Sequence, residues 1–177
     1  MKATGIVRRI DELGRIVIPK EIRKTLRIKE GENLEIYVDS DENIILRKHS
    51  LMNKINDFAQ NFAEAIYSFI KHDIIITDTN TVIACAGQSK KDYLNKPISE
   101  KLQNSIIRRE NILEKYEKNY SVIEGKEESG TYTISSIIAN GDAVGLVMIA
   151  SNEEKITEIE ERVAKIASQF LGKYLEE

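Results

Sequence analysis

Two short stretches within residues 4–18 are rich in apolar, β-branched side chains and are separated by a polar turn, a pattern typical of paired strands. Residues 4–10 and 15–18 are rich in β-branched side chains and flank a DELG tetrapeptide, so they predict a hairpin with Gly14 in a left-handed conformation. Pro19 suits the first turn of a helix, and KEIRKTL after it predicts about two helical turns. The chain is therefore expected to begin with a hairpin and a short helix.

Apolar and polar residues alternate after this helix. Leu34, Ile36 and Val38 alternate with Glu35, Tyr37 and Asp39, which predicts a strand, and residues 43–48 after an Asp-Ser-Asp turn are predicted as its partner. The N-terminal unit, residues 1–50, is therefore expected to contain two strands, a helix and two strands. A unit of about 50 residues buries too small a fraction of its surface to be reliably stable alone, so we expect it to fold as an oligomer.

Beyond residue 50 the apolar spacing changes to alternating fours and threes, which predicts an amphipathic helix with a coiled-coil-like seam. Its apolar positions are Leu51, Ile55, Phe58, Phe62, Ala65 or Ile66, and Phe69. The last segment repeats the pattern behind a capping box at Ser151 to Glu154, with Ile156, Ile159, Val163, Ile166, Phe170 and Tyr174. Two such helices can pack together, and in a dimer they would form a four-helix bundle.

The segment between the two heptad helices is mixed. The pattern predicts strands over residues 73–78, 82–86 and 120–125, a helix over residues 99–109, and a hairpin of residues 131–138 and 143–149 closed by Ala-Asn-Gly-Asp. The predicted fold class is therefore α+β, with an antiparallel sheet flanked by helices in residues 51–177.

Charge changes the picture for the N-terminal unit. Residues 1–29 hold nine Lys or Arg against three acids, although the whole chain has a net charge of −3. On the predicted helix, Lys20, Arg23, Lys24 and Arg27 share one face, opposite Ile18, Ile22 and Leu26. The remaining candidates are Lys2, Arg8, Arg9 and Arg15. Positive charge confined to one part of an acidic protein favours a polyanionic partner, and double-stranded DNA is the leading candidate. The alternative is a solvated cationic face with no partner.

Specific motifs strengthen this hypothesis. GIVRRIDELGRIVIPKEIRKTLRI, with EGENLEIYVD and IILRK after it, resembles the DNA-binding domain of AbrB-type transition-state regulators. SKKDYLNKPISEKL and IANGDAVGLVMI resemble the stage V sporulation protein T family, whose C-terminal part is a GAF domain. The resemblance covers essentially the whole chain. It implies DNA contacts by the residues that match the family motif, Arg8, Arg15, Arg23 and the next basic position, which is Lys24 here.

The resemblance also implies an assembly and a role. The N-terminal unit would form an interleaved, swapped-hairpin β-barrel dimer, and helical bundles of the GAF parts would join dimers into a tetramer. The implied function is a forespore transcription factor that activates some sporulation genes and represses others. The GAF domain could bind a small effector, or it could be a dimerisation scaffold with a filled pocket.

Other classes fit the sequence less well. One cysteine and two histidines disfavour a metal site, and no cofactor motif is present. Cys85 in an apolar strand is expected to be a buried hydrophobe, and Asp73 and Asp78 are expected to end a strand, so we predict no enzyme. The sequence has no signal peptide or membrane-spanning run, which predicts a cytoplasmic protein associated with the nucleoid. An antitoxin or protein-binding module remains an alternative, but it should carry a disordered acidic tail.

Overall fold

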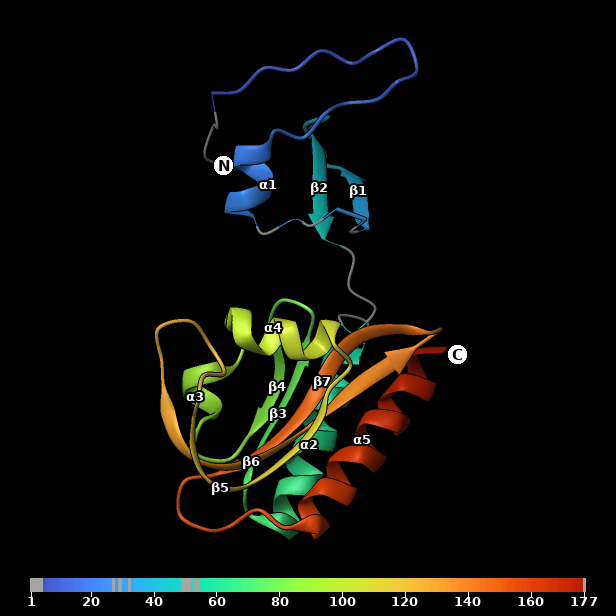
Figure 1. The fold of residues 1–177 in the computed structure, drawn as a ribbon. Coiled ribbons are helices and arrows are strands. Elements are labelled where there is room, and N and C mark those ends of the chain that lie inside the picture. The colour runs from blue at the N-terminus through green and yellow to red at the C-terminus, as the bar shows by residue number, and fades with distance from the viewer. Residues whose placement is uncertain are drawn as a thin grey trace. The chain divides into compact units, whose positions relative to one another are not determined.

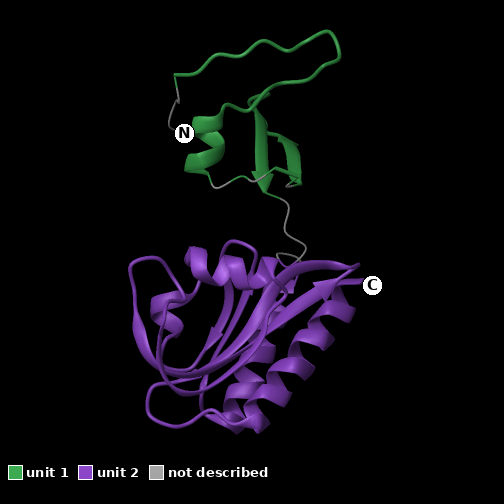
Figure 2. Cartoon of the chain, in the orientation of Figure 1, with its two compact units in different colours: residues 1–49 green, residues 50–177 purple. Residues whose placement is uncertain are grey.

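The computed structural model describes residues 5–26, 28, 30–31, 33–48, 52 and 55–176. The chain divides into two compact units, Met1–His49 and Ser50–Glu177 (Figure 2). The predictions for Lys2, Arg27 and Leu51 fall outside the described residues. Among the described residues, no helix is long and apolar enough to span a membrane.

The first unit begins with two extended arms around a turn. The structure assigns no strand to residues 5–19, so the strands predicted for residues 4–10 and 15–18 are wrong for the single chain. Gly14 has the predicted left-handed conformation, with φ of 75°. Several apolar side chains of the arms are exposed to solvent, Val7 by 86% and Val17 by 72%, so little packing supports a ladder there.

A short helix and a strand pair complete this unit (Figure 1). Helix α1 spans Lys20–Thr25, directly after Pro19. Strands β1 (Leu34–Val38) and β2 (Ile44–Lys48) pair in antiparallel register, as predicted. Ile18 and Ile22 are half-buried, whereas Leu26 is 56% exposed, so the apolar side of α1 is only partly covered.

The second unit is an antiparallel five-stranded sheet of order β4-β3-β7-β6-β5. Its strands are β3 (Asp73–Asp78), β4 (Val82–Ala86), β5 (Asn111–Tyr120), β6 (Glu128–Ala139) and β7 (Asp142–Ser151). Its helices are α2 (Asn56–Ile70), α3 (Lys90–Tyr93), α4 (Glu100–Ile107) and α5 (Glu158–Glu176). Figure 1 shows α2 and α5 side by side along one face of the sheet, with α3 and α4 on the other face.

The alternation along each strand divides the second unit into two cores. In β3, Ile74 and Ile76 pack with Ala59 and Leu171 from the helices α2 and α5. Ile75 points the opposite way and belongs to the core beneath α4. The sheet is therefore covered on both faces, and the sequences of the neighbouring strands β3 and β4 are accordingly rich in buried apolar residues.

Most predicted elements of this unit are confirmed, and two are wrong. The strand predicted for residues 120–125 is wrong: β5 ends at Tyr120 instead of beginning there. The charged sequence of β5 gave no sign that it forms an edge strand. The predicted capping box at Ser151 is a turn: Ser151 Oγ accepts a hydrogen bond from the N–H of Glu154 while Ser151 still pairs in the sheet. The capping box that starts α5 lies at Thr157 and Glu160, whose Oε2 accepts a 2.7 Å bond from the Thr157 N–H.

Candidate nucleic-acid interface and effector pocket

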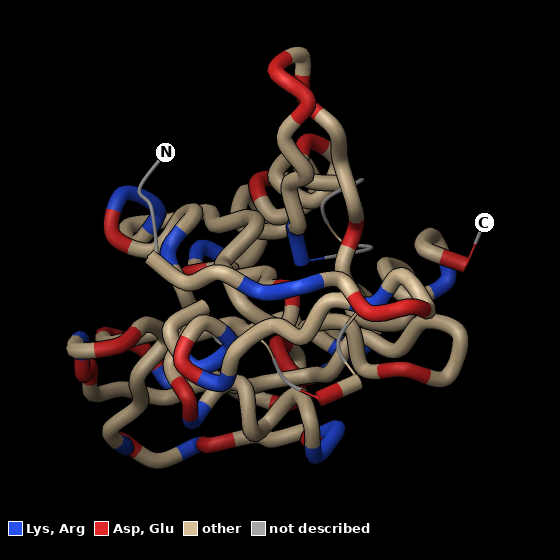
Figure 3. Tube along the Cα trace, turned by 90° about the horizontal axis from the view of Figure 1, so that it is seen from above, with Lys and Arg blue, Asp and Glu red and all other residues tan. Residues whose placement is uncertain are grey.

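Seven described cationic side chains of the first unit are exposed, of which Arg47 lies on β2. We call the other six the basic face: Arg8, Arg9, Arg15, Lys20, Arg23 and Lys24. On α1, Lys20, Arg23 and Lys24 stand at i, i+3 and i+4, so the helix turns them to one side. Arg8 and Arg9 lie on the first arm. The structure brings together the helix group on α1, and Arg15 on the second arm bonds to Asp11 at the turn. Figure 3 shows how Lys and Arg are distributed along the chain.

A carboxylate organises the turn between the arms. Asp11 Oδ1 accepts hydrogen bonds from the N–H groups of Leu13 and Arg15, at 3.0 and 2.8 Å. Asp11 Oδ2 accepts a 2.8 Å bond from Arg15 Nε. These bonds to Arg15 lower the pKa of Asp11, so the carboxylate stays ionised. The Arg15 side chain remains 70% exposed, which leaves the rest of its guanidinium open to a partner.

The other members of the basic face differ from Arg15. Within the described residues, Arg8, Arg9, Lys20, Arg23 and Lys24 have no carboxylate at ion-pair distance. Their charge is therefore available to an external anion.

The first unit also exposes an apolar surface. Strand pairing sets Ile36 opposite Leu46 and Val38 opposite Ile44, so these four side chains share one face of the strand pair. Ile36 and Val38 are each 70% exposed. Together with the apolar arms, this face makes a surface that the single chain leaves uncovered.

Aromatic side chains of α2 and α5 contact one another. The rings of Phe58 and Tyr174 stack at 4.6 Å between centroids, and those of Phe62 and Phe170 lie 5.5 Å apart. Farther out, Ile159 and Ile166 of α5 are 68% and 66% exposed. We call these residues the helical seam: Phe58, Phe62, Ile159, Ile166, Phe170 and Tyr174. Only part of the predicted heptad positions therefore faces outward. Ile55 and Ile156 are buried in the core with Ala164, Ala167 and Leu171, and Phe58, Phe62 and Val163 pack against that core.

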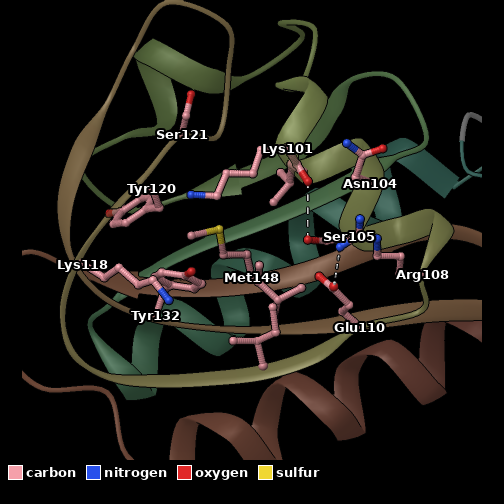
Figure 4. A pocket seen from close by; sticks show the side chains of 13 residues that line it. Lys101, Asn104, Ser105, Arg108, Glu110, Lys118, Tyr120, Ser121, Tyr132 and Met148 are labelled. Carbon is pink, nitrogen blue, oxygen red and sulfur yellow. Dashed lines mark hydrogen bonds and ion pairs between the residues drawn. The ribbon is translucent and has the colours of Figure 1, made fainter.

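A cavity of about 300 Å³ opens on the opposite face of the sheet, beneath α4 (Figure 4). Its apolar floor includes Ile134 and Met148 from the sheet, and the rings of Tyr120 and Tyr132 lie 5.2 Å apart beside them. The Tyr120 hydroxyl donates to Asn152 Oδ1 at 2.8 Å. Burial raises the pKa of Tyr120, so this phenol stays protonated and acts as a fixed donor.

The sequence did not reveal this cavity. Its lining comes from α4, β5, β6 and β7, and only the sheet order brings these elements together. No local motif marks it, because each lining residue also fits a solvated helix or an ordinary strand.

The candidates for catalysis have structural roles. Cys85 is fully buried, as expected, and burial raises its pKa to about 12. Asp73 accepts a 2.7 Å hydrogen bond from the Gln88 N–H, and Asp78 accepts one of 2.6 Å from the Thr81 N–H. Both aspartates therefore hold loops at the ends of β3. The described residues contain no cluster of three metal-binding side chains.

Two family models match the chain. The model described as the C-terminal domain of stage V sporulation protein T, a transcription factor, matches residues 54–176. The model described as antidote-toxin recognition MazE, a bacterial antitoxin, matches residues 7–52. The two matches thus correspond to different parts of the chain.

Individual proteins match the whole chain or one of its parts. Stage V sporulation protein T of Bacillus subtilis strain 168 is 47% identical over 178 residues, which are 100% of both chains. Transition state regulatory protein AbrB of the same strain is 67% identical over 49 residues, 28% of this chain and 50% of that one. The GAF domain of the nutrient sensor CodY from Clostridium difficile has a TM-score of 0.50 at 11% identity, over 88% of this chain and 94% of that chain, which shows a GAF fold. The full-length identity and the family match together show that the chain belongs to the stage V sporulation protein T family of transcription factors.

Proposed function

We propose that the chain regulates sporulation genes by binding double-stranded DNA through the basic face. The observation that carries this proposal is the set of exposed cations on the first unit of a chain whose net charge is −3. Within the described residues, Arg15 alone among them has a carboxylate partner. Uncompensated cations gathered on one unit suit the phosphates of DNA, because each contact releases a condensed counterion.

The length of α1 limits how the unit reads DNA. The helix has six residues, too few to lie along a major groove as a recognition helix. We therefore expect phosphate contacts to supply the affinity, and DNA shape and flexibility to supply much of the specificity. Arginines at positions 8, 15 and 23 can in addition bind guanine with two hydrogen bonds, whereas Lys24 offers a single point charge.

A second copy of the chain would complete the first unit. Among the described residues the arms form no strand ladder, and the side chains of Val7 and Ile36 are exposed. Two copies that exchange their hairpins in an interleaved β-barrel would give the arms strand partners and cover these side chains. The dimer would present two basic faces at a fixed separation, as a two-fold DNA site requires.

The helical seam would join such dimers. Ile159 and Ile166 are exposed beside the stacked rings of the seam, and two copies of the α2–α5 pair would bury them in a four-helix bundle. The resulting assembly is a tetramer that holds two DNA-binding barrels together.

The second unit would also sense a small effector in the cavity beneath α4 and bias the DNA-binding state. We place this regulator in the cytoplasm, associated with the nucleoid, and in the forespore, where it activates some genes and represses others. It has no catalytic step of its own in this proposal, because its thiol is buried and its strand-end aspartates hold loops.

The matched antitoxin family makes a toxin-binding module the alternative function. Swapped-hairpin barrels of that kind neutralise toxins through a C-terminal extension. Here the segment after the first unit is a folded sheet domain that ends in the 19-residue helix α5. The observation that favours DNA regulation is therefore this folded second unit.

Substitution of the basic face tests the proposal. Arg23→Ala is expected to weaken binding to a sporulation-promoter duplex about tenfold, because a dimer loses two charge-assisted contacts. Arg8→Ala and Arg15→Ala should act in the same direction, although Arg15→Ala also removes the bond to Asp11. Fluorescence anisotropy with labelled duplex measures the affinity.

Lys91→Ala is the matched control, since Lys91 is exposed on α3 of the second unit. Circular dichroism and sedimentation should be the same for wild type and all variants. Unchanged DNA affinity in all three arginine variants would refute the assignment of the basic face.

A further inference from the structure

The cavity beneath α4 has an uneven distribution of charge. Three cationic side chains line it, Lys101, Arg108 and Lys118, against the carboxylate of Glu110. They come from separate elements, α4, the residues directly after it, and β5. The mouth of the cavity is therefore electropositive although the whole chain is acidic.

Two of these cations already have partners. Arg108 Nη1 lies 3.8 Å from Glu110 Oε1. Lys118 Nζ donates a 2.8 Å hydrogen bond to Glu114 Oε2, and this bond raises the pKa of Lys118. Both charges are balanced before any ligand arrives.

Lys101 differs from the other two. Within the described residues its ammonium has no carboxylate partner, and its hydrogen bond to the Asn119 carbonyl is long, at 3.5 Å. Figure 4 shows this ammonium pointing toward Tyr120, above the thioether of Met148. The Lys101 ammonium thus lies above the apolar floor of the cavity and is not neutralised by a carboxylate among the described residues.

The size and lining of the cavity restrict what it can hold. Its volume of about 300 Å³ is at the lower end of ligand pockets. Such a volume suits a molecule of about ten to fifteen non-hydrogen atoms, smaller than a nucleotide. Ile134, Met148 and the Tyr132 ring would contact an apolar body, and a single free cation matches one negative charge instead of several.

We propose that this cavity binds a small organic monoanion, with an apolar body against Met148 and Tyr132 and a carboxylate on Lys101. This inference rests on the effector-sensing part of the proposed function and names the chemical class of the effector. A charge-assisted bond to Lys101 supplies the preference for an anion, and burial of the apolar body supplies most of the remaining affinity.

Methionine methyl groups offer a direct test in the full-length protein. The chain has three methionines, of which Met148 lines the cavity and Met52 lies in the core on the other face of the sheet. With ¹³C-methyl methionine, the Met148 resonance reports on the cavity and the Met52 resonance is an internal control. The probes are butanoate, 4-methylpentanoate and 3-phenylpropanoate, each compared with its neutral amide.

We expect 3-phenylpropanoate to shift the Met148 resonance with a Kd on the order of 1 mM, and not the Met52 resonance. Its amide should bind about tenfold more weakly. Lys101→Gln, at an exposed position, should reduce this preference to less than about twofold, as expected when one charge-assisted bond is lost. Lys91→Gln removes the charge of a residue that does not line the cavity, so it should leave the preference unchanged.

Three results would overturn the proposal. The first is that no carboxylate shifts the Met148 resonance at about 10 mM, which is ten times the expected Kd. The others are equal binding of acid and amide, and an unchanged preference for the acid in Lys101→Gln. Measurement of DNA affinity on the same samples without probe separates the two hypotheses. If the cavity binds no anion but the protein still binds DNA, only the proposal of an anionic effector is refuted. If the cavity binds the anion but the protein does not bind DNA, the assignment of the basic face is refuted instead.

Discussion

Single residues in the second unit illustrate how packing suppresses reactivity. Cys85 lies fully buried in the edge strand β4. The Gln60 side chain of α2 accepts a hydrogen bond from the Cys85 N–H at 3.1 Å and donates one to its carbonyl at 3.0 Å. This amide occupies the place of a neighbouring strand, so it protects the sheet edge and holds the thiol inside.

The buried thiol gives a prediction at the residue scale. With a pKa of about 12, only about one thiol in ten thousand is ionised at pH 8. Native protein should therefore react with an aromatic disulfide reagent at least about a hundredfold more slowly than protein unfolded in urea. The reaction is followed by absorbance, and its rate should rise as the pH approaches the pKa. Rapid reaction of the native protein at pH 8 would show that the thiol is accessible.

Residues that act locally could be predicted from the sequence, whereas residues joined by topology could not. Lys20, Arg23 and Lys24 share a face of one helix, so their spacing alone identified them. Lys101 and Met148 are far apart in the chain and meet only because β7 lies in the middle of the sheet, under α4. Charge and spacing therefore found the helix part of the basic face but not the cavity.

Secondary-structure elements that depend on local sequence could likewise be predicted, whereas those that depend on long-range pairing could not. The β6–β7 hairpin was predictable because Asn140 and Gly141 have the positive φ values, 50° and 82°, that its turn requires. Strand β5 was missed because its outer edge is solvated and its sequence is highly charged. The arms of the first unit were predicted as strands from their β-branched residues, but a ladder also needs a paired neighbour, and the described residues form none there.

The C-terminal helix combines two faces with different functions. Small residues such as Ala164 and Ala167 let α5 lie close to the sheet. Gly172 is required for this approach, since a Cβ there would lie 2.2 Å from the Ile138 carbonyl oxygen. The opposite face carries the exposed part of the helical seam, which gives the element-scale prediction.

We expect Ile166→Asp to split a tetramer into dimers. Ile166 is 66% exposed, so a charge there costs the single chain little, but it would be buried in a four-helix bundle without a partner. Each mutated dimer interface would lose several kcal/mol, about 3–5 by comparison with unpaired buried charges. Sedimentation velocity should show a particle of half the wild-type mass.

Gln169→Asp is the control for this prediction, because Gln169 is exposed on α5 outside the helical seam. It should keep the wild-type mass. If both variants sediment like wild type, the seam does not form the proposed bundle.

At the scale of the whole molecule, charge and assembly act together. The first unit concentrates cations, and residues 51–177 carry a net charge of −5, which disfavours contact of that part with DNA. A tetramer would present four basic faces in two barrels, and binding of one barrel raises the local DNA concentration for the other. An effector that alters how the second units join the two barrels would then change the avidity for DNA, without any change in the basic face itself.

The salt dependence of DNA binding tests the central claim most directly. The dimeric Ile166→Asp protein isolates one barrel, and about five phosphate contacts from each of its two basic faces predict a slope of log K against log salt near −9. Arg23→Ala in the same background removes two contacts and should reduce the magnitude of the slope by about 2. A slope near zero, or one that Arg23→Ala leaves unchanged, would contradict the account.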